Sequence, residues 1–95
     1  MRTEQTNAVR ALIVAVHRAT HKAALELAGA GAQGLAWLHA EAGSSRTVLE
    51  AGDRYAPAAL EGLIGFAPKR FAAPEVAQLM AHRAFLRARE LDEAG

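Results

Sequence analysis

The fold depends on the stretch AALELAGAGAQG, residues 23–34. Its first part, residues 23–28, is short and apolar, and three glycines follow within residues 29–34. Ala, Leu and Glu favour helix, so intrinsic propensity alone would prolong the preceding helix through this stretch. Closely spaced glycines break a helix, however, and a short apolar run that leads into such a turn is typical of a buried strand that feeds a helix. We therefore predict a strand over residues 23–28.

A helix is expected immediately before this stretch, over residues 3–20. The larger apolar side chains recur there at steps of three and four positions, which is the pattern of an amphipathic helix. The recurring residues are Val9, Leu12, Ile13 and Val16. His17 and His21 lie four positions apart, but no carboxylate or Cys accompanies them. We therefore expect two solvated histidines rather than metal ligands.

After the glycines, a short helix and a second strand are expected. Residues 35–41 are predicted to form the helix, with Gly43 as its C-terminal cap and Trp37 as its anchor in the core. Residues 44–46 are predicted to turn, and residues 47–51, which include β-branched side chains, are predicted to form the strand. Two strands with a helix between them indicate an α/β protein.

Two helices follow the second strand. Pro57 suits a first helical turn and Gly65 ends that helix, whereas residues 66–71 are expected to be irregular. Pro74 opens the last helix, which has an apolar inward stripe and a charged outer face. The stripe contains Val76, Leu79, Met80, Ala84 and either Leu86 or Ala88, and the outer face contains Arg83, Arg87, Arg89 and Glu90. The predicted order is α-β-α-β-α-α.

Composition excludes several classes of protein. The 95 residues carry 11 Lys and Arg against 10 Asp and Glu, a formal net charge of +1, and contain no Cys. Duplex DNA needs many clustered cations, so we expect no nucleic-acid partner. The longest weakly charged stretch is broken by Glu26 and by glycines, and the amino terminus lacks an apolar signal region, so we expect no membrane segment. We expect a cytoplasmic chain without disulfides, metal or cofactor.

Alanine dominates the apolar content of the chain. The sequence is 52% hydrophobic, but 24 of its residues are alanine. A domain of this size buries only about 60 to 65% of its unfolded surface, so few large side chains leave a thin margin of stability. We therefore expect association with another chain.

The glycines of residues 29–34, GAGAQG, match the pattern G-x-G-x-x-G between a predicted strand and a predicted helix. Glycines let backbone N–H groups approach a phosphate, and the following helix N-terminus carries partial positive charge. Glu50, at the end of the next predicted strand, is placed like the ribose-binding acid of a dinucleotide fold, although it follows Gly34 by 16 positions where about 20 is usual. A dinucleotide site and a purely structural glycine turn both fit these residues.

A second group of polar residues surrounds the second predicted strand. Ser44 and Ser45 open this segment, and Tyr55 follows Ser45 by ten positions. A tight reversal would bring Ser45 and Tyr55 to one pocket. Because a serine becomes a nucleophile only with a base nearby or a lowered pKa, the alternative is that both serines bond local backbone in a turn.

Several motifs follow one another in a distinctive order. They are GAQGLAWL at residues 31–38, GSSRTVLE at residues 43–50, then Tyr55, Leu60, Leu63, Gly65 and Phe66, and finally the helix around residues 77–91. This set resembles the CinA C-terminal-like family, in particular the branch with a G-x-S-Q-A-L-x-W-L segment and an S-R-T-V-L-E-x-x-x-x-Y segment. The resemblance runs from about Leu25 to Leu91.

The resemblance implies an α/β/α layered domain and nicotinamide-nucleotide amidohydrolase activity, which converts the amide of nicotinamide mononucleotide to the acid and ammonia. The better-known branch has the pattern P-G-S-S-x-x-F-x-G-G-x-V-x-Y-S-N-x-x-K, with the second serine as nucleophile assisted by the tyrosine and lysine. Matched without gaps, these fall on Ser45, Tyr55 and Leu60. Loss of a general base costs about 10² to 10⁴ in rate, so the leucine weakens the hydrolase interpretation and leaves the pocket.

We therefore expect a site for a nicotinamide nucleotide or a related small anionic ligand. Its catalytic candidates are Ser45 and Tyr55, and its ligand-binding candidates are Gly31, Ala32, Gln33, Gly34, Ser44 and Arg46. A degenerate amidohydrolase is one form of this hypothesis. The alternatives are a non-enzymatic interaction protein that self-associates and a Rossmann-like dinucleotide binder.

The family domain continues beyond the length of this chain with further strands. Two parallel strands leave outer backbone groups unpaired and apolar surface uncovered. We therefore expect residues 1–95 to be a single CinA-like domain or half-domain, which is completed by another copy or by a complementary chain, or which is a truncated form.

Overall fold

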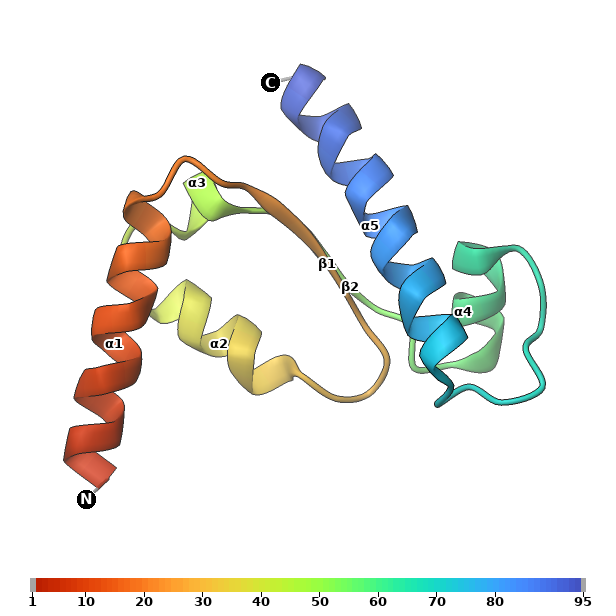
Figure 1. Ribbon diagram of the computed structural model, residues 1–95, viewed down its shortest axis with the longest axis horizontal. Helices are drawn as coiled ribbons and strands as arrows, with labels where there is room; N and C mark the ends of the chain where they lie inside the picture. The colour runs from red at the N-terminus through yellow and green to blue at the C-terminus, as the bar shows by residue number, and fades with distance from the viewer. Residues whose placement is uncertain (1, 95) are drawn as a thin grey trace.

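The computed structural model describes the backbone of residues 2–94 and the side chains of residues 6–93. Its helices and strands follow the predicted order, with one additional short helix before the second strand (Figure 1). The elements are α1 (Arg2–Arg18), β1 (Ala23–Leu27), α2 (Ala32–Ala40), α3 (Ser44–Thr47), β2 (Val48–Asp53), α4 (Pro57–Ile64) and α5 (Pro74–Ala94). No helix within residues 2–94 is both long enough and apolar enough to cross a membrane.

The two strands confirm the prediction for the stretch that decides the fold. β1 and β2 pair in parallel, with Leu25 opposite Ala51 and Leu27 opposite Asp53. The register is irregular only near the start of β1, between Ala23 and Ala24. Because the strands are parallel, the turn after β1 and the segment after β2 leave the sheet on the same side, where both strands have their carboxyl ends. We call this side the carboxyl edge, and the opposite side, where both strands begin, the amino edge.

The helices α4 and α5 form the apolar core. Leu60 and Ile64 of α4 pack with Val76 and Met80 of α5, and Leu60 is only 1% exposed. α5 also lies along β1 and β2. The predicted inward stripe of the last helix is therefore confirmed, and so are the helix start at Pro57 and its end at Gly65, which has a φ of 94°.

The helices α1 and α2 are packed much less closely. Ile13 of α1 is buried, but Leu12 is 62% exposed, so the predicted stripe is wrong at that position. Trp37 of α2 is 45% exposed, and the prediction that it anchors the core is also wrong. The reason is the placement of α2, which packs mainly against α1 and α3 instead of against the sheet.

The link between α2 and β2 differs from the predicted turn. α2 ends at Ala40, and its C-terminal cap is Glu41 rather than Gly43. Gly43, with a φ of 103°, instead precedes the short helix α3 as its N-terminal cap. Ser44, the first residue of α3, therefore lies in a helical turn.

The molecule is flat and open. Its extents are 41 × 37 × 18 Å, and its radius of gyration is 14.9 Å, whereas a compact chain of this length has about 12 Å. Figure 1 shows the strands between α1 and α2 on one side and α4 and α5 on the other. Within the described residues β1 and β2 pair only with each other. Each strand therefore keeps one free edge along its length, where its backbone groups pair with no other strand.

Candidate functional site

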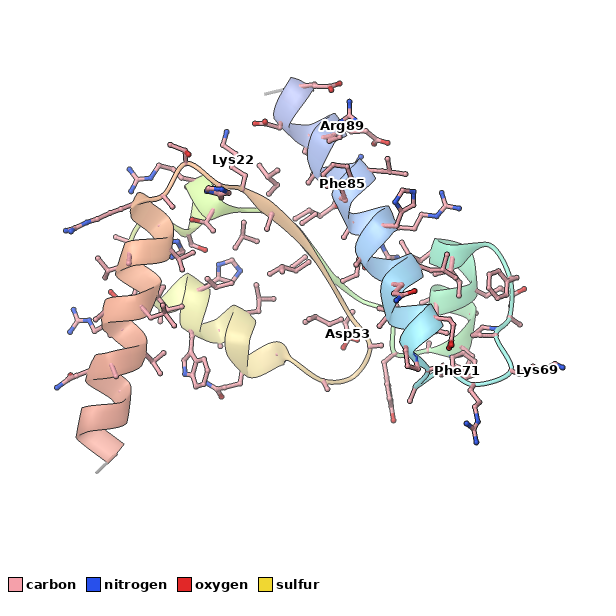
Figure 2. All side chains as sticks on the ribbon, viewed as in Figure 1. Lys22, Asp53, Lys69, Phe71, Phe85 and Arg89 are labelled. Atoms are coloured by element: carbon pink, nitrogen blue, oxygen red, sulfur yellow. The ribbon has the colours of Figure 1, made fainter. Side chains whose placement is uncertain are left out.

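The carboxyl edge of the sheet is held together by two hydrogen bonds between the segments that leave it. The backbone N–H of Gly29 donates to Oδ1 of Asp53 at 2.9 Å. The backbone N–H of Arg54 donates to the carbonyl of Leu27 at 2.6 Å. The glycine turn and the end of β2 therefore form one surface, on which Asp53 is exposed (Figure 2).

Two glycines in the turn meet a backbone requirement that other residues satisfy poorly. Gly29 and Gly31 have φ values of 81° and 92°, in the left-handed region that glycine adopts without steric cost. A Cβ on Gly29 would also collide with the ring of Tyr55, which lies against the turn. Gly34 lies inside α2 and faces open space. The backbone conformation therefore requires glycine at the first two positions of the motif, Gly29 and Gly31, but not at Gly34.

Because the glycine turn connects β1 to α2, the amino end of α2 lies at the carboxyl edge. Gly31 is the N-terminal cap, no side chain bonds to the cap, and the first turn holds no acidic residue. The N–H groups of Gly34 and Leu35 donate to the carbonyl of Gly31. The N–H groups of Ala32 and Gln33 have no partner within the helix, because the first N–H groups of any helix lack one. Such donors, together with the helix dipole, suit an anion.

The structure separates the predicted site residues into two groups. Residues 31–34 lie at the carboxyl edge together with Tyr55, whereas residues 44–46 lie in α3 at the opposite, amino edge. The tight reversal predicted between Ser45 and Tyr55 is absent, because β2 runs extended between them. At about 3.3 Å per residue, the six residues of β2 span roughly 20 Å.

At the amino edge, Ser44 and Arg46 have local structural neighbours. Oγ of Ser44 lies 2.7 Å from Nδ1 of His39, at hydrogen-bond distance. The guanidinium of Arg46 lies beside Gly43, where a Cβ would meet it at 2.7 Å. Ser45 is exposed.

His17 joins three helices near the amino edge. Its Nε2 lies 2.7 Å from the carbonyl of Leu38 in α2, and its Nδ1 lies 2.7 Å from Oγ1 of Thr47 in α3. A carbonyl only accepts, so Nε2 carries a proton and donates to Leu38, whereas the threonine hydroxyl can donate to Nδ1 or accept from it. His17 is 3% exposed, so the prediction of a solvated side chain is wrong, whereas His21 is exposed as expected. In the last turn of α1, His17 is buried because it lies against the ends of α2 and α3.

Glu50 does not lie at the position that the dinucleotide interpretation gives to the ribose-binding acid. It lies within β2, and both its carboxylate oxygens accept from Arg87 of α5, at 2.9 and 3.1 Å. These hydrogen bonds hold the pKa of the Glu50 carboxyl below its ordinary value. The acid at the carboxyl edge is Asp53, which follows Gly34 by 19 positions. Sequence reasoning missed Asp53 because the strand was predicted to end at Ala51, although the spacing to Gly34 would have favoured it.

A cleft adjoins this edge on the side of α4. It has a volume of about 740 Å³, and its exposed aromatic walls are Tyr55 and Phe71, which are 76% and 45% exposed. Leu60, which falls on the lysine of the CinA pattern, lies at the base of the cleft and is fully buried in the core. Its side chain supplies no proton acceptor.

A metal site or a likeness to known proteins would also indicate a function. Among the side chains of residues 6–93, no three His, Asp or Glu residues gather in a way that could hold a metal ion. No family model, curated protein or solved structure matches the chain.

Proposed function

We propose that this chain is a CinA-like α/β unit that binds a nicotinamide nucleotide, or a related small anionic ligand, at the carboxyl edge of its sheet. The observation that carries the proposal is the left-handed turn at Gly29 and Gly31, which presents the uncapped amino end of α2 where both parallel strands end. Binding at the carboxyl ends of parallel strands is the general rule for open α/β sheets. The ligand phosphate accepts from the N–H groups of Ala32 and Gln33.

Asp53 completes this arrangement. One of its carboxylate oxygens is bonded to the N–H of Gly29, and the second has no hydrogen bond within the described residues. A carboxylate at the end of the second strand is the usual acceptor for ribose hydroxyls in dinucleotide-binding folds. The Rossmann-like alternative therefore uses Asp53 in place of Glu50.

Hydrolysis by a Ser45 and Tyr55 pair within one chain is not part of the proposal. Ser45 precedes β2 and Tyr55 follows it, so the two residues lie at opposite ends of the strand. A nucleophile must lie within hydrogen-bond reach of its base. The position of the CinA lysine holds the buried Leu60. The proposed role is therefore binding.

A charge placed in the first turn of α2 tests the proposal. In Gln33→Glu the new carboxylate suits the positive end of the helix, so the fold is retained, but it repels a bound phosphate. We expect affinity for nicotinamide mononucleotide, measured by isothermal titration calorimetry, to fall by about 1 kcal/mol, which is roughly fivefold.

The matched control is Gln78→Glu, which makes the same change on the exposed face of α5 and should leave affinity unchanged. Absence of binding to the unaltered protein, or equal affinities of the two variants, contradicts the proposal.

Self-association is a second candidate function, favoured by the free edge on each strand and by the exposed apolar side chains Leu12 and Trp37. Unpaired strand edges are templates for pairing with another chain. Light scattering at micromolar concentration should then give at least twice the mass of the chain. A single species of 10.0 kDa would contradict this candidate.

A further inference from the structure

We infer that the cleft between Tyr55 and Phe71 receives the planar ring of a nucleotide base, while the sugar phosphate lies on the glycine turn. This inference rests on the proposed function, because it assigns the second end of the same ligand. It gives Tyr55 a role in stacking rather than in catalysis, and it adds Phe71, which no sequence motif indicated.

The walls of the cleft have the chemistry that a flat ring needs. Tyr55 and Phe71 both line it, and both remain substantially exposed although each is a large aromatic side chain. Any nucleotide base can stack on an aromatic side chain, because every base has a π-face. The remaining lining is almost wholly apolar, with Pro57 and Leu60 at the start of α4. The volume of about 740 Å³ lies within the range of small-molecule sites.

The cleft is continuous with the phosphate position. Ala28, which follows β1, lines the cleft, and the next residue is Gly29, the first left-handed glycine of the turn. The ring of Tyr55 lies directly against Gly29, and this contact is possible only because glycine lacks a Cβ. One turn of backbone therefore separates the aromatic wall from the N–H groups at the start of α2. A ligand with a ring at one end and a phosphate at the other matches both features.

The charge of the cleft also suits a neutral or cationic ring better than a second anion. Arg54 lines the cleft, but its guanidinium is already bonded to Glu26 at 2.8 Å. The side chain of Glu26 is 5% exposed, so the pair is fixed in place. The cation is thereby neutralised, and the aromatic faces remain as the main source of binding.

Two probes that differ only by the ring test the inference. Nicotinamide mononucleotide carries the ring, and ribose 5-phosphate is the same molecule without it. Isothermal titration with both measures the contribution of the ring in the unaltered protein and in three variants, namely Tyr55→Phe, Tyr55→Leu and Phe71→Leu. The changed side chains are exposed, and thermal unfolding by circular dichroism verifies that each variant folds.

We expect the nucleotide to bind about 5- to 100-fold more tightly than ribose 5-phosphate. Tyr55→Leu and Phe71→Leu should each remove most of this ratio, whereas Tyr55→Phe should keep it because the ring is retained. Equal affinity of the two probes, or an unchanged ratio in both leucine variants, overturns the base cleft and leaves the phosphate site standing. Loss of the ratio in Tyr55→Phe also overturns it, because the hydroxyl would then be the essential group. Binding of neither probe overturns both the cleft and the proposed function.

Discussion

The two sides of the sheet are stabilised by different kinds of interaction. On one side, α4 and α5 bury a continuous apolar cluster around Leu60 and Met80. On the other, α1, α2 and α3 meet at His17, whose two ring nitrogens bond to Leu38 and Thr47. None of the residues of α2, all of which are described, is buried.

This contrast indicates which side of the sheet tolerates the loss of a single interaction better, namely the side of α4 and α5. Apolar packing is non-directional and scales with buried area, whereas a buried hydrogen-bonded group is costly once a single partner is lost. The amino end of α2 carries the proposed phosphate site, which therefore lies on the less tightly packed side. We expect α2 to open at a lower free energy than α5, as is common for ligand-binding elements.

The largest expected effect comes from the apolar side. Leu60→Ala leaves a cavity at the most buried side chain of the core, and we expect it to lower the free energy of unfolding by about 2 to 5 kcal/mol in urea denaturation. The control is Leu63→Ala on the same helix, where the side chain is only half-buried and the loss should be smaller. Equal losses would contradict the placement of Leu60 at the centre of this core.

A smaller effect is expected on the polar side. His17→Leu keeps the apolar volume but leaves the carbonyl of Leu38 and the hydroxyl of Thr47 without their partner, which costs about 1 to 3 kcal/mol. Hydrogen exchange should accelerate in α1, α2 and α3 and remain slow in α5. His21→Leu, at an exposed position, is the control and should have little effect. Uniform acceleration across all helices would erase the proposed distinction between the two sides.

The smallest effect concerns charge on the side of α5. Arg87 lowers the pKa of Glu50, so the stabilisation by this pair is present above the ordinary pKa of 4.5 and is lost as the pH falls through the lower folded value. Glu50→Gln should therefore slightly lower the urea midpoint at pH 7 and have less effect at pH 3. Glu61→Gln on α4 is the control, because the side chain of Glu61 is exposed. An equal shift at both pH values would contradict the assignment.

Local sequence signals predicted the elements well. The closely spaced glycines identified β1 although the propensity of residues 23–28 favours helix, and Pro57 and Gly65 marked both ends of α4. These signals succeed because they act through backbone geometry within a few residues. The apolar stripe of α5 was also predictable, since a helix with one apolar face must bury that face.

The candidate site was only half predictable. The glycine turn was found, but its partners were sought in Ser45 and Glu50, which the parallel pairing places elsewhere. Spacing in a sequence does not give the length of a strand, and the continuation of β2 to Asp53 moved the candidate acid by three positions, from Glu50 to Asp53. His17 was misjudged for a related reason, because its burial depends on where distant helices end.

The free edges of the two strands have a consequence for how copies would join. If β1 meets β1 of a second copy across a twofold axis perpendicular to the sheet, the contact is antiparallel and the particle is closed with respect to that edge. If β1 meets β2 of the next copy, the contact is parallel and head-to-tail, and an unused edge persists at each end of the growing row. A twofold contact through one of the two edges alone thus gives a discrete dimer, whereas head-to-tail addition, which uses both edges, gives a fibre from the same pair of strands.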